Sequence, residues 1–439
     1  MFLRGIYNQA SQNLVRKYST RHVLGLPRLP VLESVLAKAR RDGFRFNRTA
    51  VISTKHMLYT NYINWAQQIK LLGLRPENEK VHGICCSNDF EVIEMVRALG
   101  IEVADSSTTF TNKIPYDDLL ESLVGKWLIH SLQTINWSEV DQLILYDNGG
   151  KLLVQFNELL QKAKKGEFPE GVPEEVFAKI KVVGIAHTRS TFYFLEEKTM
   201  HFPIVDMARH RIKVLYESKF IAADTARTAR EIMKKTDHYA SNILLYGGGR
   251  IAEELEPKLR SFFPGNIEVF DLQYERSDFP LEYLEEKLQE SRIIIDATGR
   301  RPKKDFLSLM LPGTTLLNAS SSNRSFNIDR NIEKLEEYDD YRISPVIGNG
   351  VIAQWSGFPI NLARTVGDEQ YITKGLRTNS EVHQVTRALE IAAKITSLQL
   401  FARIKPVLQN EENGCFAISY PYTQLIKCEM LLNYGSSLG

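Results

Sequence analysis

Apolar residues follow two alternating patterns along the first half of the chain, short apolar runs and stretches with helical spacing. The stretches, at 31–41, 62–72 and 92–99, place apolar residues every three or four positions, as an amphipathic helix requires. Strands that alternate with helices predict a parallel sheet covered on both faces. We therefore predict an α/β domain over 31–220, with strands at 50–53, 82–86, 101–104, 142–146, 179–185 and 202–205.

A second series of apolar runs follows a predicted connecting helix at 222–235. It predicts a second doubly wound domain over 221–370, after which a helix at 378–400 returns to the first domain. The predicted fold is therefore α/β with two doubly wound parallel-sheet domains and a ligand cleft between them. A basic arm at 1–30 precedes these domains, and 401–439 forms a C-terminal segment without a clear pattern.

Three glycines stand between an apolar run at 243–246 and a helical pattern. Gly247, Gly249 and Ala252 fit the spacing G-x-G-x-x-G/A, in which small residues let the backbone and the helix start approach a pyrophosphate. The alternative is a glycine turn that binds nothing. The motif predicts cofactor contacts from this turn and from the ends of the next two strands, at Gly247, Gly248, Gly249, Arg250, Ile251, Asp271, Thr298 and Gly299.

Asp271 decides which dinucleotide the turn would prefer. It follows the next predicted strand, where an acid meets the ribose hydroxyls. A carboxylate there would repel a 2′-phosphate, so NAD is favoured over NADP. The second of the two doubly wound domains is therefore predicted to be a Rossmann NAD-binding domain.

Charge and cysteine content exclude several classes of protein. A formal net charge of +2 over 439 residues gives no field that would attract nucleic acid. No apolar run approaches the roughly twenty residues of a membrane helix, so we predict no membrane partner. The four cysteines lack the spacing of a disulfide scaffold or a zinc site, which predicts buried free thiols and no bound metal at Cys85, Cys86, Cys415 and Cys428.

The N-terminal arm is the one compositional anomaly. Its first thirty-two residues contain no Asp or Glu but carry Arg4, Arg16, Lys17, Arg21 and Arg28. A basic surface arm of a cytoplasmic protein is the simpler interpretation. The same composition is typical of an organellar transit peptide, so import stays an alternative.

Short segments in one order along the chain carry a resemblance to a known family. They are Ser53 to Met57, Asp147 to Gly150, Gly184 to Thr191, Pro203 to Glu217, Leu317 to Ser321 and Ser356 to Leu362. With these in register, the chain resembles the S-adenosylhomocysteine hydrolase family over most of its length. That family uses a resident NAD to oxidise a ribose hydroxyl and later reduces the product with the same cofactor.

The resemblance implies roles for individual residues. Lys213 would take the hydroxyl proton, with Glu217, His56 and Asp147 as further catalytic groups. The positions that match the family's NAD contacts outside the glycine turn are Ser190, Thr191, Asn318 and Asn361.

The residues that differ from the family's pattern lie mainly at positions that match its substrate-binding residues. Asn148 replaces an aspartate, and Thr188 replaces a glutamate that grips the sugar, with His187 and Arg189 beside it. These four residues are the predicted substrate contacts. Ser321 and Gly367-Asp368 stand where the family has histidines, and the family's C-terminal tail, which reaches a neighbouring protomer, is absent.

Three interpretations follow. The first is an NAD-dependent enzyme that oxidises a hydroxyl of a nucleoside or other alcohol in an altered pocket. The second is a catalytically inactive NAD-binding regulator, and the third is a plain NAD-dependent dehydrogenase. A homodimer or another homo-oligomer is expected for each.

Overall fold

The computed structural model divides the chain into two compact units, each an α/β fold as predicted. Unit 1 comprises Met1–Thr109, Ser122–Lys213 and Ile372–Gly439, and unit 2 comprises Phe110–Glu121 and Val214–Tyr371. The structure describes residues 29–88, 90–108, 116–195, 198–235, 242–271, 278, 280–298, 309–319, 334–335, 344–348, 351–355, 380–404 and 414–434.

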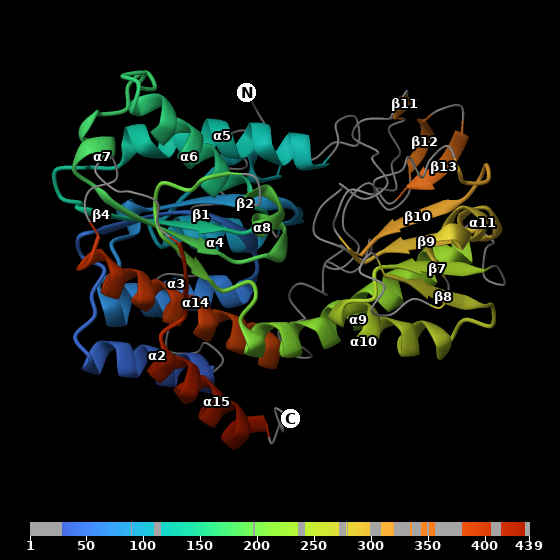
Figure 1. The fold of residues 1–439 in the computed structure, drawn as a ribbon. Coiled ribbons are helices and arrows are strands. Elements are labelled where there is room, and N and C mark those ends of the chain that lie inside the picture. Colours follow the sequence, from blue (N-terminus) through green and yellow to red (C-terminus); the bar gives the residue numbers. More distant parts are fainter. Residues whose placement is uncertain are drawn as a thin grey trace, which may run out of the picture. The chain divides into compact units, whose positions relative to one another are not determined.

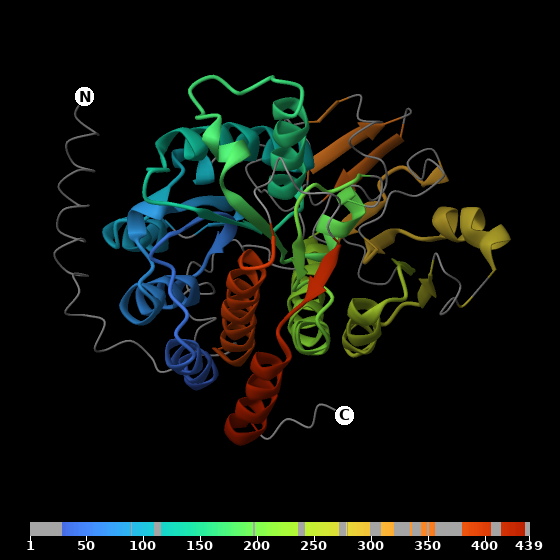
Figure 2. The ribbon, with the colours of Figure 1, turned by 60° about the vertical axis from the view of Figure 1, so that its left-hand side comes forward.

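A seven-stranded parallel sheet forms the centre of unit 1 (Figure 1). Its order is β14-β6-β5-β4-β1-β2-β3, so the chain starts in β1, moves to one edge and then returns to build the other side. The strands are β1 (Thr49–Met57), β2 (Glu79–Asn88), β3 (Glu102–Val103), β4 (Gln142–Asp147), β5 (Lys181–Ala186), β6 (Ile204–Asp206) and β14 (Cys415–Ala417). Figure 2 shows β14 beside β6, with which it pairs in parallel.

Helices cover both faces of this sheet. On one face lie α5 (Tyr116–Thr134), most of which belongs to unit 1, α6 (Lys151–Ala163) and α7 (Glu175–Ala178). On the other lie α3 (Tyr59–Leu72) and α14 (Ser380–Phe401), with α2 (Pro30–Arg41) and α15 (Tyr420–Tyr434) beyond α14. The remaining helices of this unit are α4 (Phe90–Ala98) and α8 (Arg189–Leu195).

Helix α14 is covered on two sides, by the sheet and by the outer helices α2 and α15. Its apolar residues, such as Ala388, Ile391 and Ile395, are fully buried, and so are Glu390 and Lys394. An apolar surface all round is what a buried helix needs, so charged residues within it must find partners inside the protein.

Unit 2 has a Rossmann-type sheet in the order β11-β12-β13-β10-β9-β7-β8. Its strands are β7 (Ile243–Tyr246), β8 (Ile267–Phe270), β9 (Ile293–Asp296), β10 (Thr315–Asn318), β11 (Lys334–Leu335), β12 (Ser344–Gly348) and β13 (Val351–Trp355). The pairs from β8 to β13 are parallel, whereas β12 and β11 run antiparallel at one edge, which the sequence pattern did not predict. Helices α10 (Arg250–Arg260) and α11 (Leu284–Glu290) belong to this unit, and α9 (Arg211–Lys235) leads into it.

Three local predictions need correction. Strand β1 continues beyond Ser53 to Met57, so His56 lies within the strand rather than after it. Helix α9 begins at Arg211 instead of 222, which makes Lys213 and Glu217 helical. Cys415 and Cys428 are exposed instead of buried, whereas the side chains at positions 85 and 86 lie outside the described part of the chain.

No helix among the described residues is long and apolar enough to cross a membrane. The same residues contain no group of three or more His, Cys, Asp or Glu side chains that could hold a metal ion.

Candidate functional site

A tight loop joins β4 to α6 at the carboxyl end of the unit 1 sheet. The buried Asp147 carboxylate accepts hydrogen bonds from the backbone N–H groups of Gly150 and Leu153, each at 3.0 Å. Gly150 has φ +85°, and a Cβ there would come within 2.4 Å of the Phe194 ring, so only glycine fits. Asp147 thus holds the loop in shape.

Burial raises the pKa of Asp147 to about 6, although the two backbone donors and the Thr54 hydroxyl oppose that rise. A carboxyl with this pKa would exchange a proton near neutral pH. Its oxygens are already used by the loop, so the catalytic role expected for Asp147 stays a prediction.

The same Thr54 connects β1 to the loop. Its hydroxyl accepts from the backbone N–H of Asn148 at 2.7 Å, which places buried Asn148 against the strand. On the other side, the Gly149 N–H donates to the Thr188 hydroxyl at 3.1 Å, and Thr188 contacts Ser190 at 2.9 Å. The loops after β4 and β5 therefore form one hydrogen-bonded unit.

Two residues at the start of α8 differ in exposure. Arg189 is exposed, whereas Thr191 is fully buried and its Oγ1 has no hydrogen-bond partner within the described part of the chain. An unpaired buried hydroxyl is unfavourable unless a ligand or water supplies the bond. The contact predicted between Thr191 and a cofactor is not tested by this observation alone.

His187 follows β5 and is buried against Tyr146 of β4. The Tyr146 hydroxyl lies 2.5 Å from His187 Nδ1, which leaves Nε2 as the ring nitrogen that can meet a ligand. Burial lowers the pKa of His187 well below its usual value, and the charges of Lys213, Arg387, His56 and Lys55 lower it further. The imidazole is therefore neutral, and positive groups surround it.

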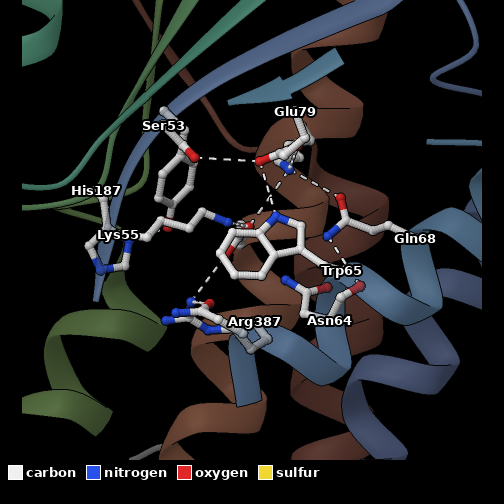
Figure 3. Close-up of polar contacts among 12 residues, drawn as sticks. Ser53, Lys55, Asn64, Trp65, Gln68, Glu79, His187 and Arg387 are labelled. Carbon is white, nitrogen blue, oxygen red and sulfur yellow. Dashed lines mark hydrogen bonds and ion pairs between the residues drawn. The ribbon is translucent and has the colours of Figure 1, made fainter. Parts of the chain in front are cut away.

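A buried ionic network lies beneath this histidine (Figure 3). Lys55 of β1 pairs with Glu390 of α14, and both side chains are at most 1% exposed. The Lys55 ammonium also lies 4.8 Å from the centre of the Trp65 ring and 4.5 Å from that of Tyr146. Burial lowers the pKa of Lys55 to about 8, although the Glu390 carboxylate favours the charged form.

Helix α14 supplies two more cations to this network. Arg387 donates to Asn61 Oδ1 of α3 and to Glu390 Oε2. Lys394 donates to Gln68 Oε1 at 3.1 Å and lies 3.7 Å from Glu79 Oε2. Asn61 in turn donates to the backbone oxygen of His56 at 2.6 Å, so α3 connects the network to the predicted site.

Sequence reasoning missed Lys55, Arg387, Glu390 and Lys394. A signal was present, because the last three interrupt an otherwise apolar helical pattern at 385–395 on one helix face. Lys55 and Glu390 are 335 positions apart along the chain, and Arg387 and Asn61 are 326 positions apart. No local sequence pattern reveals pairs this distant.

The glycine turn of unit 2 lies where the strand order changes direction. Strand β8 pairs on one side of β7 and β9 on the other, and the turn follows β7 directly. Such a topological switch point is where open α/β sheets bind ligands. Gly247 has φ +113°, and a Cβ there would come within 2.8 Å of the Thr298 side chain.

Asp271 and Asp296 close the turn from the neighbouring strands. The Gly248 N–H donates to Asp271 Oδ2 at 2.7 Å. Asp296 Oδ1 accepts from the backbone N–H and the hydroxyl of Thr298, at 3.0 and 2.6 Å. The acid expected near a ribose is therefore beside the turn that would hold the pyrophosphate.

The fit of a dinucleotide can be judged at Gly249, the residue before α10. Its φ is −69°, and a Cβ there would meet no atom within 4 Å. The fold itself thus does not require glycine at this position, whereas a phosphate that approaches the helix start would. Arg250, next to it, is paired with Glu253 and Glu254, and Ile251 is partly exposed.

The other predicted cofactor residues are Asn318, Gly299 and Asn361. Asn318 ends β10 and is 1% exposed, beside Asp296 in the parallel register. Gly299 and Asn361 lie outside the described residues, as do Ser321 and 367–368.

The structure brings His56, His187 and Lys213 of unit 1 close enough for their charges to interact. Lys213 is 7% exposed at the start of α9, and Glu217 follows one turn later, half-buried, where the helix has entered unit 2. The predicted cofactor turn is also in unit 2, so most of the predicted substrate contacts and the glycine turn occupy separate units.

Comparisons with known proteins assign the chain to no family. No family model matches the chain. Uncharacterized proteins from two strains of Mycobacterium tuberculosis are 27% identical to it over 337 residues, which is 76% of this chain. The chain spans 62% of the length of these relatives.

Among solved structures, the chain is similar to a dipicolinate synthase component from Bacillus halodurans, with 13% identity and a TM-score of 0.36, over 82% of this chain and 99% of that one. It is also similar to the NAD-dependent formate dehydrogenase from Staphylococcus aureus, with 13% identity and a TM-score of 0.30, over 63% and 75%. Likenesses this low assign neither an activity nor a cofactor to the chain.

Proposed function

We propose that the protein is an enzyme that binds NAD at the glycine turn of unit 2 and oxidises a hydroxyl group of a small molecule. One observation carries the proposal: Gly247, Gly248 and Asp271 meet at the switch point between β7, β8 and β9. This is the arrangement in which a Rossmann-type sheet holds a dinucleotide.

The residues of unit 2 fit NAD in chemical detail. Backbone N–H groups at the start of α10 would hold the pyrophosphate, and the open space at Gly249 leaves room for it. The Asp271 carboxylate would bind the ribose hydroxyls, and its charge disfavours the 2′-phosphate of NADP. Bound NAD supplies a hydride acceptor.

Helix α9 and the loop after β5 supply the groups that would handle the substrate. Lys213 would accept the proton of the hydroxyl that is oxidised, with Glu217 one turn away on α9. Neutral His187 would donate a hydrogen bond from Nε2, since Nδ1 is occupied by Tyr146. Because Asn148 and Thr188 stand where the resembling family has acids, we expect adenosylhomocysteine itself to be a poor substrate.

Cofactor binding is tested with a glycine variant chosen to spare the fold. Gly249→Val should abolish NAD binding in isothermal titration calorimetry, because the side chain fills the phosphate position. Gly414→Val is the matched control, since a Cβ at Gly414 would likewise meet no atom within 4 Å and its φ is not positive. The proposal fails if the unaltered protein binds no NAD or if Gly249→Val binds it normally.

Catalysis is tested separately with Lys213→Ala. The variant should keep NAD affinity and lose substrate-dependent NADH formation by about a hundredfold or more. If turnover is unchanged, Lys213 has no part in proton transfer. If the unaltered protein binds NAD and turns over no alcohol or nucleoside, the non-catalytic NAD-binding regulator is the better description.

A further inference from the structure

Several buried hydrogen-bonding groups at α3 and Arg387 have no partner among the residues that the structure describes. Arg387 Nε is one of them, although the Nη1 atom of the same guanidinium is bonded to Asn61 and Glu390. On the facing helix α3, both side-chain atoms of Asn64 and the hydroxyl of Thr60 are also buried and unpaired. Leaving each such group without a bond costs free energy, so native proteins normally satisfy it.

The unpaired groups belong to one face of α3 and to the Arg387 guanidinium. Thr60 and Asn64 are four residues apart on α3, hence on the same face, and Asn61 on the adjoining position contacts Arg387 directly. Figure 3 shows Asn64 and Arg387 below the Trp65 ring, with Lys55 above the guanidinium and His187 to its upper left. The unpaired hydrogen-bonding groups therefore lie on two helices, Arg387 on α14 and Thr60 and Asn64 on α3.

Each of these unpaired groups except Asn64 Oδ1, an acceptor, can donate a hydrogen bond. The unpaired donors are the Arg387 Nε–H, the Asn64 amide NH₂ and the Thr60 hydroxyl. The Nε2 atom of His187 is a fourth candidate donor, because Nδ1 of the same ring contacts the Tyr146 hydroxyl. Tyr146 can donate its hydroxyl proton to Nδ1, which would place the ring proton of neutral His187 on Nε2. A ligand that satisfies four donors must offer several acceptor oxygens close together, as a carboxylate or a phosphate does.

The acids nearby are engaged elsewhere. Glu390 binds Lys55 and Arg387, and Glu79 accepts from Trp65 Nε1 at 3.0 Å and lies near Lys394. The Asp147 oxygens are used by the backbone of its own loop. An entering anion would therefore meet the guanidinium without first displacing a carboxylate from the unpaired Nε.

We propose that Arg387, Asn64, Thr60 and His187 form the receptor for a carboxylate or phosphate group of the substrate, so that the protein acts on an anionic alcohol. This inference rests on the proposed function, because only an enzyme has a substrate. Anion binding by the receptor can nevertheless be tested without any turnover.

The test measures anion binding in a background that cannot hold a dinucleotide phosphate. Gly249→Val protein is titrated by calorimetry with malonate, with inorganic phosphate and with malonamide, the neutral counterpart of malonate. Malonate or phosphate should bind and malonamide should not. Whichever anion binds more tightly identifies the group as carboxylate or phosphate.

Asn64→Leu separates a ligand role from a structural one. Because the Asn64 amide has no partner, the apolar variant should keep or raise the thermal unfolding temperature while anion affinity falls about tenfold or more. Arg387→Gln should also weaken the anion by at least about tenfold, with circular dichroism confirming the fold. Arg48→Gln is the control, an exposed residue that pairs with Asp141 where β1 and β4 begin.

The result that overturns the proposal is equally definite. It is wrong if neither anion binds, if malonamide binds as well as malonate, or if Asn64→Leu and Arg387→Gln leave affinity unchanged. NAD binding by the unaltered protein is measured in parallel. NAD binding without anion binding rejects only this receptor, whereas anion binding without NAD binding rejects only the proposed function.

Discussion

In both units the candidate site lies at the carboxyl ends of parallel strands, but different interactions stabilise the two sites. In unit 2 the site consists of a glycine turn, backbone N–H groups and an acid within thirty residues of sequence, from Gly247 to Asp271. In unit 1 it consists of charged side chains from β1, β2 and α14 with neutral polar partners on α3, and several of these side chains are fully buried.

This difference has a physical cause. Helix α14 is enclosed by the sheet and by outer helices, so its charges must pair internally, and long-range ion pairs result. The turn in unit 2 needs only small residues and one positive φ angle. Unit 1 should therefore respond strongly to loss of a charge, and unit 2 should respond chiefly to added side-chain volume.

The largest effect is expected from Lys55→Met. Removing the ammonium leaves the Glu390 carboxylate buried with only Arg387 and Lys394 nearby, which should cost about 3–5 kcal/mol of unfolding free energy. Urea denaturation measures this change. Adding Glu390→Gln should recover part of the loss.

Arg48→Met is the matched control for that variant, because the Arg48–Asp141 pair is 58% and 49% exposed. It should cost no more than about 1 kcal/mol. Equal losses for Lys55→Met and Arg48→Met would show that burial does not distinguish the two pairs, and the contrast between the units would lose its basis.

The next effect is a pH dependence from Asp147. Since burial raises the pKa of this carboxyl from 3.8 to about 6, its contribution to stability is complete below pH 4 and is lost as pH rises through 6. About two pKa units correspond to roughly 3 kcal/mol. Asp147→Asn should lack this decline in unfolding free energy between pH 4 and 7.

The measurement for Asp147 is a set of urea unfolding curves across that pH range, compared with Glu158→Gln. Glu158 is 49% exposed in its pair with Lys198, so its variant changes the same charge at the surface. A wild-type protein that gains stability relative to Asp147→Asn as pH rises would have the opposite sign and would contradict the prediction.

A smaller effect is expected from Gly247→Ala. The added Cβ would lie 2.8 Å from the Thr298 side chain at a φ of +113°, which should cost about 1–3 kcal/mol and impair NAD binding. Gly249→Ala should leave stability nearly unchanged, since no atom lies within 4 Å. Thermal unfolding temperatures of the two variants, whose substitutions are two positions apart, show whether backbone strain and steric contact at Gly247 cause the loss of stability.

A small change in stability is also expected from Asp271→Asn. Asp271 is partly exposed and its hydrogen bond with Gly248 can persist with an amide oxygen, so the loss should stay within about 1 kcal/mol. The ratio of NAD to NADP affinity should nevertheless fall, because the charge that repels a 2′-phosphate is gone. An unchanged ratio in calorimetry would mean that Asp271 does not meet the ribose.

Most strands and helices were predictable, because buried apolar runs and helical spacing mark them directly. The apolar run at 243–246 and the glycines after it correspond to β7 and the turn before α10. The prediction failed where polar residues are buried: the strand ending at Ser53 in fact continues through Lys55 and His56. It also missed β14 and α15, whose residues show no clear periodicity.

By itself the sequence determined the α/β class, the order of most strands and helices, and the glycine turn with Asp271, because each depends on residues close together along the chain. Only the tertiary structure decided which charges meet: Lys55 with Glu390, Arg387 with Asn61, and His187 with Tyr146. Burial sets the energies of those pairs, and burial depends on which segments enclose a residue. In the first two pairs the enclosing segment is more than three hundred positions away along the chain.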